Sequence, residues 1–105
     1  MFVIKVSSAG HHAGSLAEIT INNEPIRIEM NENGHYRGLH IVIINPLNGK
    51  VEYSRAFDTY MSSMAFESFI DLGLPPGSIV VAACKDDCAT KLSEKVKDWF
   101  LEMGS

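Results

Sequence analysis

The chain has few of the features that mark several common classes of protein. It lacks a long apolar run: the longest ones, Ile41 to Ile44 and Ile79 to Cys84, fall far short of the roughly 20 residues that cross a bilayer. Basic residues are also few, with 9 Lys and Arg against 13 Asp and Glu, so the net charge is −4. A nucleic-acid binder normally carries a basic surface, and the acidic balance argues against this class. We therefore expect neither nucleic-acid binding nor membrane insertion by this domain.

Recognition motifs for catalysis or modification are likewise missing. The sequence has no Gly-rich phosphate loop, no Gly-x-Ser-x-Gly elbow and no His-Glu-x-x-His pair. It also has no Asn-x-Ser/Thr acceptor, so N-glycosylation is not expected. The pattern places none of the four histidines beside a cysteine, as a thiol catalyst would need. We therefore predict no catalytic residue, no bound metal and no cofactor, and keep a thiol or metal-dependent enzyme only as a distant third alternative.

The chain contains only two cysteines, Cys84 and Cys88. Two cysteines make neither a disulfide framework nor a four-ligand zinc site. A turn between them would bring their Cα atoms to about 5.5 Å, which is disulfide range. The alternative is a pair of unpaired buried thiols, which behave as small apolar groups. Export would favour the disulfide and a cytosolic location the thiols.

The first half of the chain has the alternation of β-strands. The pattern predicts a short strand that ends at Ser7 and a hairpin around Asn22-Asn23, because asparagine tolerates the positive φ of a tight turn. The run from Gly38 to Asn45 is nearly all apolar, which is typical of a strand that is covered on both faces. The turn signal Asn48-Gly49 then predicts a second strand through Phe57, paired with the first.

Helical signals appear in the second half. Ser62 or Ser63 is suited to cap a helix that closes at Gly73, and Ser78 to Cys84 is another apolar strand. Asp86 or Asp87 is expected to cap the last helix. That helix carries one apolar stripe, made of Leu92, Val96, Trp99, Phe100 and Met103. The whole chain, 1–105, is predicted to be a single α+β domain, with two mainly antiparallel sheets flanked by about two to three helices.

An ordered set of segments resembles a known family. These segments are Arg37 to Asn45, Asn48-Gly49, Arg55 to Tyr60, Gly77 to Val80, Lys85 to Leu92 and Leu101 to Ser105. Together they resemble the ILEI/PANDER-like domain, also called the GG domain. That domain is known from the secreted interleukin-like EMT inducer and pancreatic-derived factor family. It also occurs in the stem of the protein O-mannose N-acetylglucosaminyltransferase and in hyaluronan-degrading cell-surface proteins.

The resemblance implies a compact β-β-α fold and a non-catalytic module. The version in the transferase stem binds carbohydrate, whereas the secreted members act as signals. The family also implies an extracellular or secretory-pathway location, although the chain opens like a strand and not like a signal peptide. Family members usually continue past the last helix into a further strand, so we expect this domain to lack its final strand after Ser105.

Our leading interpretation is a carbohydrate-binding, lectin-like module, and the alternative is a secreted signalling or protein-interaction domain. A sugar site needs an aromatic platform beside amide or carboxylate groups. The candidate ligand-binding residues are Tyr53, Arg55, Asp58, Tyr60, Asp86 and Asp87. Each has a structural alternative: Tyr53 packs in the core, Asp58 caps a turn and the Asp pair caps a helix. The partner is therefore a glycan or a protein, and the oligomeric state stays open.

Overall fold

The computed structural model describes residues 3–8, 17–59, 61–85 and 93–102 of the 105. Six strands and two helices lie in these ranges. Their order is β1 (Ile4–Ser8), β2 (Ala17–Ile21), β3 (Glu24–Pro25), β4 (Gly38–Ile44), β5 (Val51–Phe57), α1 (Met64–Leu72), β6 (Ile79–Lys85) and α2 (Glu94–Glu102). The predicted α+β class is confirmed.

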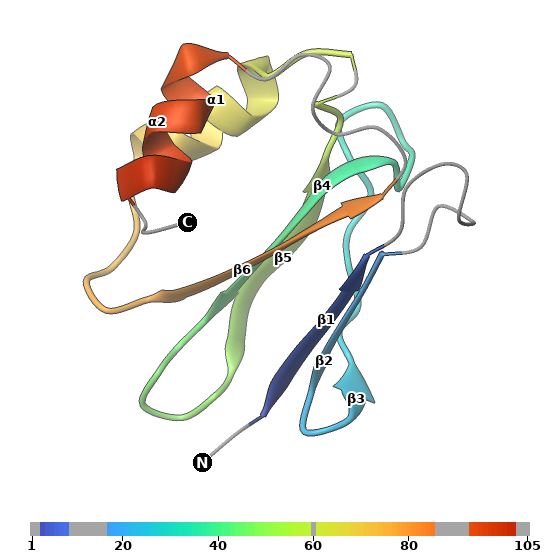
Figure 1. Cartoon of the computed structure of the whole chain (residues 1–105), viewed down its shortest axis with the longest axis vertical. Helices are drawn as coiled ribbons and strands as arrows, with labels where there is room; N and C mark the ends of the chain where they lie inside the picture. The colour runs from blue at the N-terminus through green and yellow to red at the C-terminus, as the bar shows by residue number, and fades with distance from the viewer. Residues whose placement is uncertain (1–2, 9–16, 60, 86–92, 103–105) are drawn as a thin grey trace.

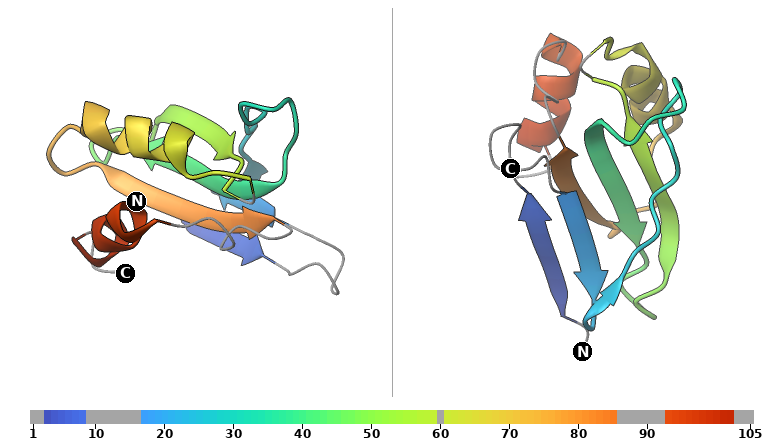
Figure 2. Two further views of the ribbon diagram at one scale, coloured as in Figure 1. Left: turned by 90° about the horizontal axis from the view of Figure 1, so that it is seen from above. Right: turned by 90° about the vertical axis from the view of Figure 1, so that its right-hand side faces the viewer.

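The strands form two antiparallel sheets of three strands each. One has the order β1-β2-β3 and the other has the order β5-β4-β6. Figure 1 shows the first sheet on one side of the β5-β4-β6 sheet and both helices on the other. The two further views show the same arrangement from above and from the side (Figure 2). The central sheet therefore has one helical and one β-covered face.

Strand β4 occupies the centre of this arrangement, and all seven of its residues are buried. Ile41 and Ile43 belong to the core beneath the helices, whereas Val42 and Ile44 belong to the core shared with β2. Successive side chains of a strand point to opposite faces, so a strand covered on both sides is mainly apolar, and His40 is the one titratable residue of β4. The prediction of a strand buried on both faces is confirmed.

Local backbone chemistry closes the turns as expected. Asn22 and Asn23 both have positive φ, 52° and 69°, and they join β2 to β3. After β3 the chain runs alongside β5, where the N–H of Glu29 donates to the Ser54 carbonyl at 3.3 Å and the N–H of Ala56 donates to the Glu29 carbonyl at 2.9 Å. This segment connects the two sheets and covers the outer edge of β5.

Both helices pack on the central sheet through aromatic side chains. The Trp99 ring of α2 meets the Phe66 ring of α1 edge-on, with 5.3 Å between the centroids. Trp99 is only 8% exposed, and Val96 is fully buried. The predicted apolar stripe is thus confirmed for Val96, Trp99 and Phe100, while Leu92 and Met103 lie outside the described residues.

The predicted cap of the last helix was wrong. We expected Asp86 or Asp87 to cap it, but α2 begins at Glu94. The hydroxyl of Ser93 accepts a hydrogen bond from the N–H of Val96 at 3.3 Å, which is the geometry of an N-terminal cap. The rule that Ser, Thr, Asp and Asn cap helices holds, but the sequence offers several such residues before the helix, and we chose the wrong ones.

Candidate functional site

Asp58, a predicted ligand-binding residue, is fully buried and already hydrogen-bonded within the protein. Its carboxylate accepts hydrogen bonds from Asn33 Nδ2 at 2.8 Å, from Arg37 Nε at 3.1 Å and from Arg37 Nη2 at 3.1 Å. Its backbone N–H donates to Glu32 Oε1 at 3.0 Å. These bonds join the loop before β4 to the end of β5. The carboxylate is 0% exposed, so this arrangement leaves it no surface for a ligand.

The surroundings of Asp58 also favour its ionised form. Burial raises the pKa of the carboxyl, but the hydrogen bonds from Arg37 and Asn33 and the positive charge of Arg37 outweigh burial and lower the pKa below its usual value. The buried Asp58 carboxylate and the partly exposed Arg37 guanidinium form a structural ion pair. Asp58 therefore anchors the chain here.

Arg55 has a similar structural setting. Its Nη2 lies 3.4 Å from Glu32 Oε1, and its Nε donates to the Ala56 carbonyl at 3.1 Å. The guanidinium also lies over the Phe57 ring, 4.4 Å from the centroid, which is cation–π distance. Arg55 is half-buried, and these contacts leave it a supporting residue of the β5 edge.

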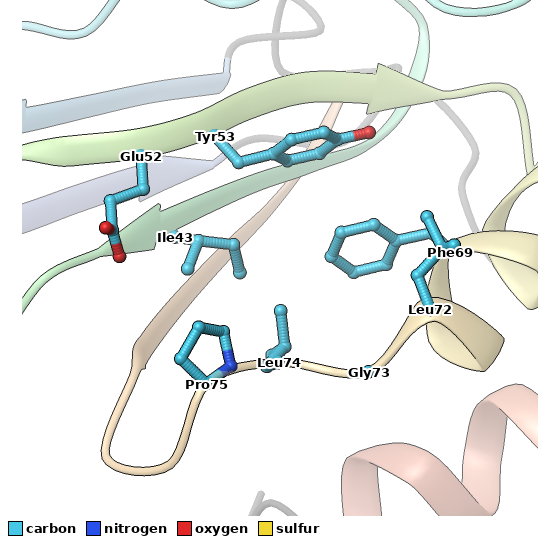
Figure 3. Close-up of a pocket in the computed structure, with 8 residues that line it drawn as sticks. All are labelled: Ile43, Glu52, Tyr53, Phe69, Leu72, Gly73, Leu74 and Pro75. Carbon is cyan, nitrogen blue, oxygen red and sulfur yellow. The ribbon is translucent and has the colours of Figure 1, made fainter.

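Tyr53, another of the predicted residues, lines a groove. This groove has a volume of about 270 Å³ and lies between β5 and the connection from α1 to β6. Figure 3 shows the Tyr53 ring above it and Phe69, Leu74 and Pro75 around it. The Tyr53 ring stacks on Phe69 with 5.0 Å between centroids and an interplanar angle of 27°. The groove is lined in full by Ile43, Glu52, Tyr53, Phe69, Leu72, Gly73, Leu74 and Pro75.

A β-bulge places two consecutive residues of β5 in this groove. Ile43 pairs with Tyr53, but the next residue, Ile44, pairs with Val51, so Glu52 is an extra residue in β5. Consecutive residues of a regular strand point to opposite faces, and a bulge removes this constraint. Glu52 is exposed, and both Glu52 and Tyr53 line the groove. The bulge thus puts a carboxylate at the rim of an otherwise apolar surface.

Two further grooves continue from the first around the same connection. The second, of about 410 Å³, shares Gly73, Leu74 and Pro75 with the first and extends to Trp99 and Glu102. The third, of about 440 Å³, shares Ile70, Trp99 and Glu102 with the second. We call this continuous set the α1–β6 belt. Its lining comes from β4, β5, the two helices and residues 73–78.

The remaining predicted residues are not part of this description. Tyr60, Asp86, Asp87 and Cys88 lie outside the described residues. The sequence reasoning missed most of the belt, above all Glu52, Leu72 and Leu74. A signal was present: Leu72 and Leu74 flank the helix-ending Gly73, just before two prolines. Leu72 is 85% exposed, whereas Leu74 is partly buried against the core.

The chemistry of the belt changes along its length. The first groove presents mainly aliphatic and aromatic groups, and such surfaces bind by removing apolar area from water. The third groove is lined by the charged Lys95, Asp98 and Glu102 beside Ile70 and Trp99. Within the described residues, no three His, Cys, Asp or Glu side chains gather as metal ligands would. No helix in the described ranges is both long and apolar enough to cross a membrane.

The structure is a small α+β domain with a set of adjoining surface grooves, and comparison with known proteins gives its family. The family model described as "Interleukin-like EMT inducer" matches residues 37–105. Because the match covers more than half of the chain, this protein belongs to the interleukin-like EMT inducer family. The resemblance noted from the sequence is confirmed. All residues of the α1–β6 belt lie in the matched part.

Individual relatives agree with the family. Protein FAM3A of Homo sapiens is 35% identical over 69 residues, which cover 66% of this chain and 30% of that protein. Protein FAM3D of Mus musculus is 28% identical over 107 residues, which cover 99% of this chain and 46% of that protein. Protein FAM3C of Rattus norvegicus is 32% identical over 75 residues, which cover 70% of this chain and 33% of that protein. The chain thus spans less than half the length of these relatives.

Proposed function

We propose that this domain is the protein-binding part of a secreted, interleukin-like signal, and that it docks on its partner through the α1–β6 belt. The carrying observation is that the first two grooves of the belt adjoin each other, are lined mainly by apolar groups and include the highly exposed Leu72. Exposed apolar patches of this kind mark interaction sites in soluble proteins. The description of the family, an interleukin-like inducer, supports a signal over an enzyme.

The same observations lend less support to the carbohydrate-binding interpretation. A sugar needs an aromatic face with polar groups around it. Tyr53 has one face stacked on Phe69, and the two charged candidates nearest in sequence, Arg55 and Asp58, are engaged inside the protein. The family description names an inducer and no glycan. We therefore rank protein recognition above glycan recognition, and we infer that the domain is non-catalytic and works outside the cell.

A cell-binding experiment tests this function. The purified chain, labelled with a fluorophore, is applied to cultured epithelial cells, and bound label is measured with increasing unlabelled chain as competitor. We expect saturable binding that brief protease treatment of the cells removes and glycosidase treatment leaves intact. Loss after glycosidase alone would restore the carbohydrate interpretation.

A variant pair assigns the binding to the belt. Leu72→Ser removes an exposed apolar side chain of the belt, and we expect it to compete poorly. Leu47→Ser removes a 94% exposed leucine from the turn between β4 and β5, and we expect it to compete like the parent. Equal competition by the two variants would contradict docking through the belt.

A further inference from the structure

The charges on the α1–β6 belt are biased toward one sign. Four charged residues line its grooves, namely Glu52, Lys95, Asp98 and Glu102. Lys95 is neutralised by an ion pair with Asp71, at 2.5 Å between Nζ and Oδ1. Among the described residues, no ion pair involves the three acids. The uncompensated charge of the belt is therefore negative.

The two helices add to this negative potential. Each has nine residues, and each ends at the belt: α1 ends at Leu72, which lines the first groove, and α2 ends at Glu102, which lines the second and third. The C-terminal end of a helix carries about half a negative charge from its aligned peptide dipoles. Neither helix has a basic residue in its last turn to offset it. Side-chain and backbone charges thus act in the same direction.

The position of these charges relative to the apolar lining gives the pattern of the partner. Glu52 lies at one end of the belt, on the β-bulge, and Glu102 and Asp98 lie at the other end, on α2. The second groove, which Glu102 also lines, contributes the apolar Leu74, Pro75 and Pro76 to the middle of the belt. A complementary ligand needs apolar groups in the middle and positive charge at both ends.

We propose that the belt binds a protein segment whose apolar side chains are flanked by lysine or arginine. This proposal rests on the proposed function and specifies its partner. Electrostatic complementarity of this kind steers association and selects among partners that share an apolar core. It also predicts that affinity falls as salt is added, because exposed charges are screened.

Short fluorescent peptides provide the test. Three sets of peptides have the same apolar central sequences. They differ in the residues on either side, which are lysine in one set, serine in the second and glutamate in the third. Binding to the full chain is measured by fluorescence anisotropy at low and at physiological ionic strength. We expect affinity to decrease from the lysine to the serine to the glutamate set, and the salt dependence to be largest for the lysine set.

Charge-neutralising variants locate the effect. Glu52→Gln and Glu102→Gln are each expected to weaken the lysine set about two- to fivefold, the usual size for exposed charge pairs. Glu24→Gln makes the same change on β3, away from the belt, and should leave binding unchanged. All three residues are exposed, so the variants should melt like the parent.

The outcomes separate this inference from the proposed function. Equal binding of all three sets, still sensitive to Leu72→Ser, would overturn the basic flanks and leave protein docking at the belt intact. No binding of any peptide, with Leu72-dependent cell binding retained, would overturn a linear segment as the ligand. Cell binding that ignores Leu72→Ser would overturn the proposed function itself.

Discussion

Gly38 lies where β4 approaches the backbone of β5 so closely that no side chain can be accommodated. Its φ is +105°, and a Cβ atom built there would lie 2.1 Å from the carbonyl oxygen of Phe57. That distance is far inside van der Waals contact, and the obstacle is backbone, which moves less readily than a side chain. Only glycine is compatible with both the dihedral angle and the contact.

Replacing Gly38 should therefore destabilise the domain strongly. We expect Gly38→Ala to lower the free energy of unfolding by about 3 kcal/mol or more, as backbone strain and overpacking combine. The matched control is Gly34→Ala, where φ is +76° but no atom lies within 4 Å of the added Cβ. It should lose only about 1 kcal/mol. Urea unfolding measures both, and equal losses would refute the close contact.

His40 is a buried titratable group in the central strand. It is 4% exposed, and its Nε2 is hydrogen-bonded to the Tyr36 carbonyl. Burial lowers the pKa of His40 below 6.5, the bond to Tyr36 raises it in part, and the positive Lys85 lowers it again. His40 is therefore a buried, hydrogen-bonded residue of β4.

The domain should lose stability when mildly acidified because of His40. In the unfolded chain the histidine takes up a proton near pH 6.5, whereas in the folded state it does so only at lower pH. The unfolded state thus binds more protons below pH 6.5, and stability falls from there as pH drops through the folded pKa. Asp58 does not confound this range, because its lowered pKa keeps it ionised until more acidic pH.

Thermal melts of the parent and His40→Gln at about pH 7.5 and 5.5 check this expectation. Acidification should lower the melting temperature of the parent by more than it lowers that of the variant, whatever the stability of the variant at pH 7.5. The other histidines are common to both proteins, so the difference isolates His40. An identical loss in both would mean that His40 titrates normally.

At the level of elements, strands were predictable where burial is extreme. The nearly continuous apolar sequence of β4 and the Asn-Asn turn before β3 are strong local signals, and both elements were predicted. The bulge in β5 was not predicted. A bulge is a shift in the pairing of two strands, and the sequence of one strand does not reveal it, because Glu52 has the polar character of an ordinary outward-facing residue. The cap of α2 was missed for a related reason: polar residues that can cap helices also form loops.

Strand β4 should tolerate no charge. Ile41 is 0% exposed, and Ile41→Asp would leave a carboxylate without a partner in the core. The cost of several kcal/mol is comparable to the 5–15 kcal/mol that stabilise a typical domain, so we expect the variant to unfold. Leu47→Asp, at a 94% exposed turn position, is the control and should melt like the parent. A cooperative melt of Ile41→Asp by circular dichroism would contradict the central place of β4.

Helix α2 should behave as core and not as a detachable docking helix. Trp99 packs against Phe66, Phe69 and Phe100. We expect Trp99→Ala to cost about 3–5 kcal/mol, the range for a buried aromatic. Leu101→Ala, on the same helix but 70% exposed, should change stability by less than about 0.5 kcal/mol. The fluorescence of the parent should be blue-shifted until global unfolding, and water-like emission in the native state would mean that α2 is detached from the core.

At the scale of the whole molecule, family and fold could be predicted, but the grooves of the belt could not. Several segments that match a family in the same order identify it, because the same fold constrains each of them. The predicted site followed sequence proximity along β5 and combined Tyr53, which lines the first groove, with Asp58, which is buried. The belt joins β5 to α1, α2 and residues 73–78, and this proximity exists only after folding. The belt therefore could not be predicted from local sequence patterns, because its residues come together only in the folded structure.

The last prediction concerns the compartment in which the molecule works. Cys84 lies near the end of β6, and Cys88 follows it outside the described residues. If the protein is exported, as we propose, the oxidising environment should join them in a disulfide. A disulfide that closes so short a loop would stabilise the domain by about 2 kcal/mol on chain-entropy arguments.

We expect chain purified from the medium of a secreting eukaryotic host to show no titratable thiol after denaturation without reductant. We also expect reductant to lower its melting temperature. The Cys84→Ser, Cys88→Ser double variant is the control, whose melt reductant should leave unchanged. Two titratable thiols in the secreted parent would rule out the bridge and weaken the case for an extracellular signal.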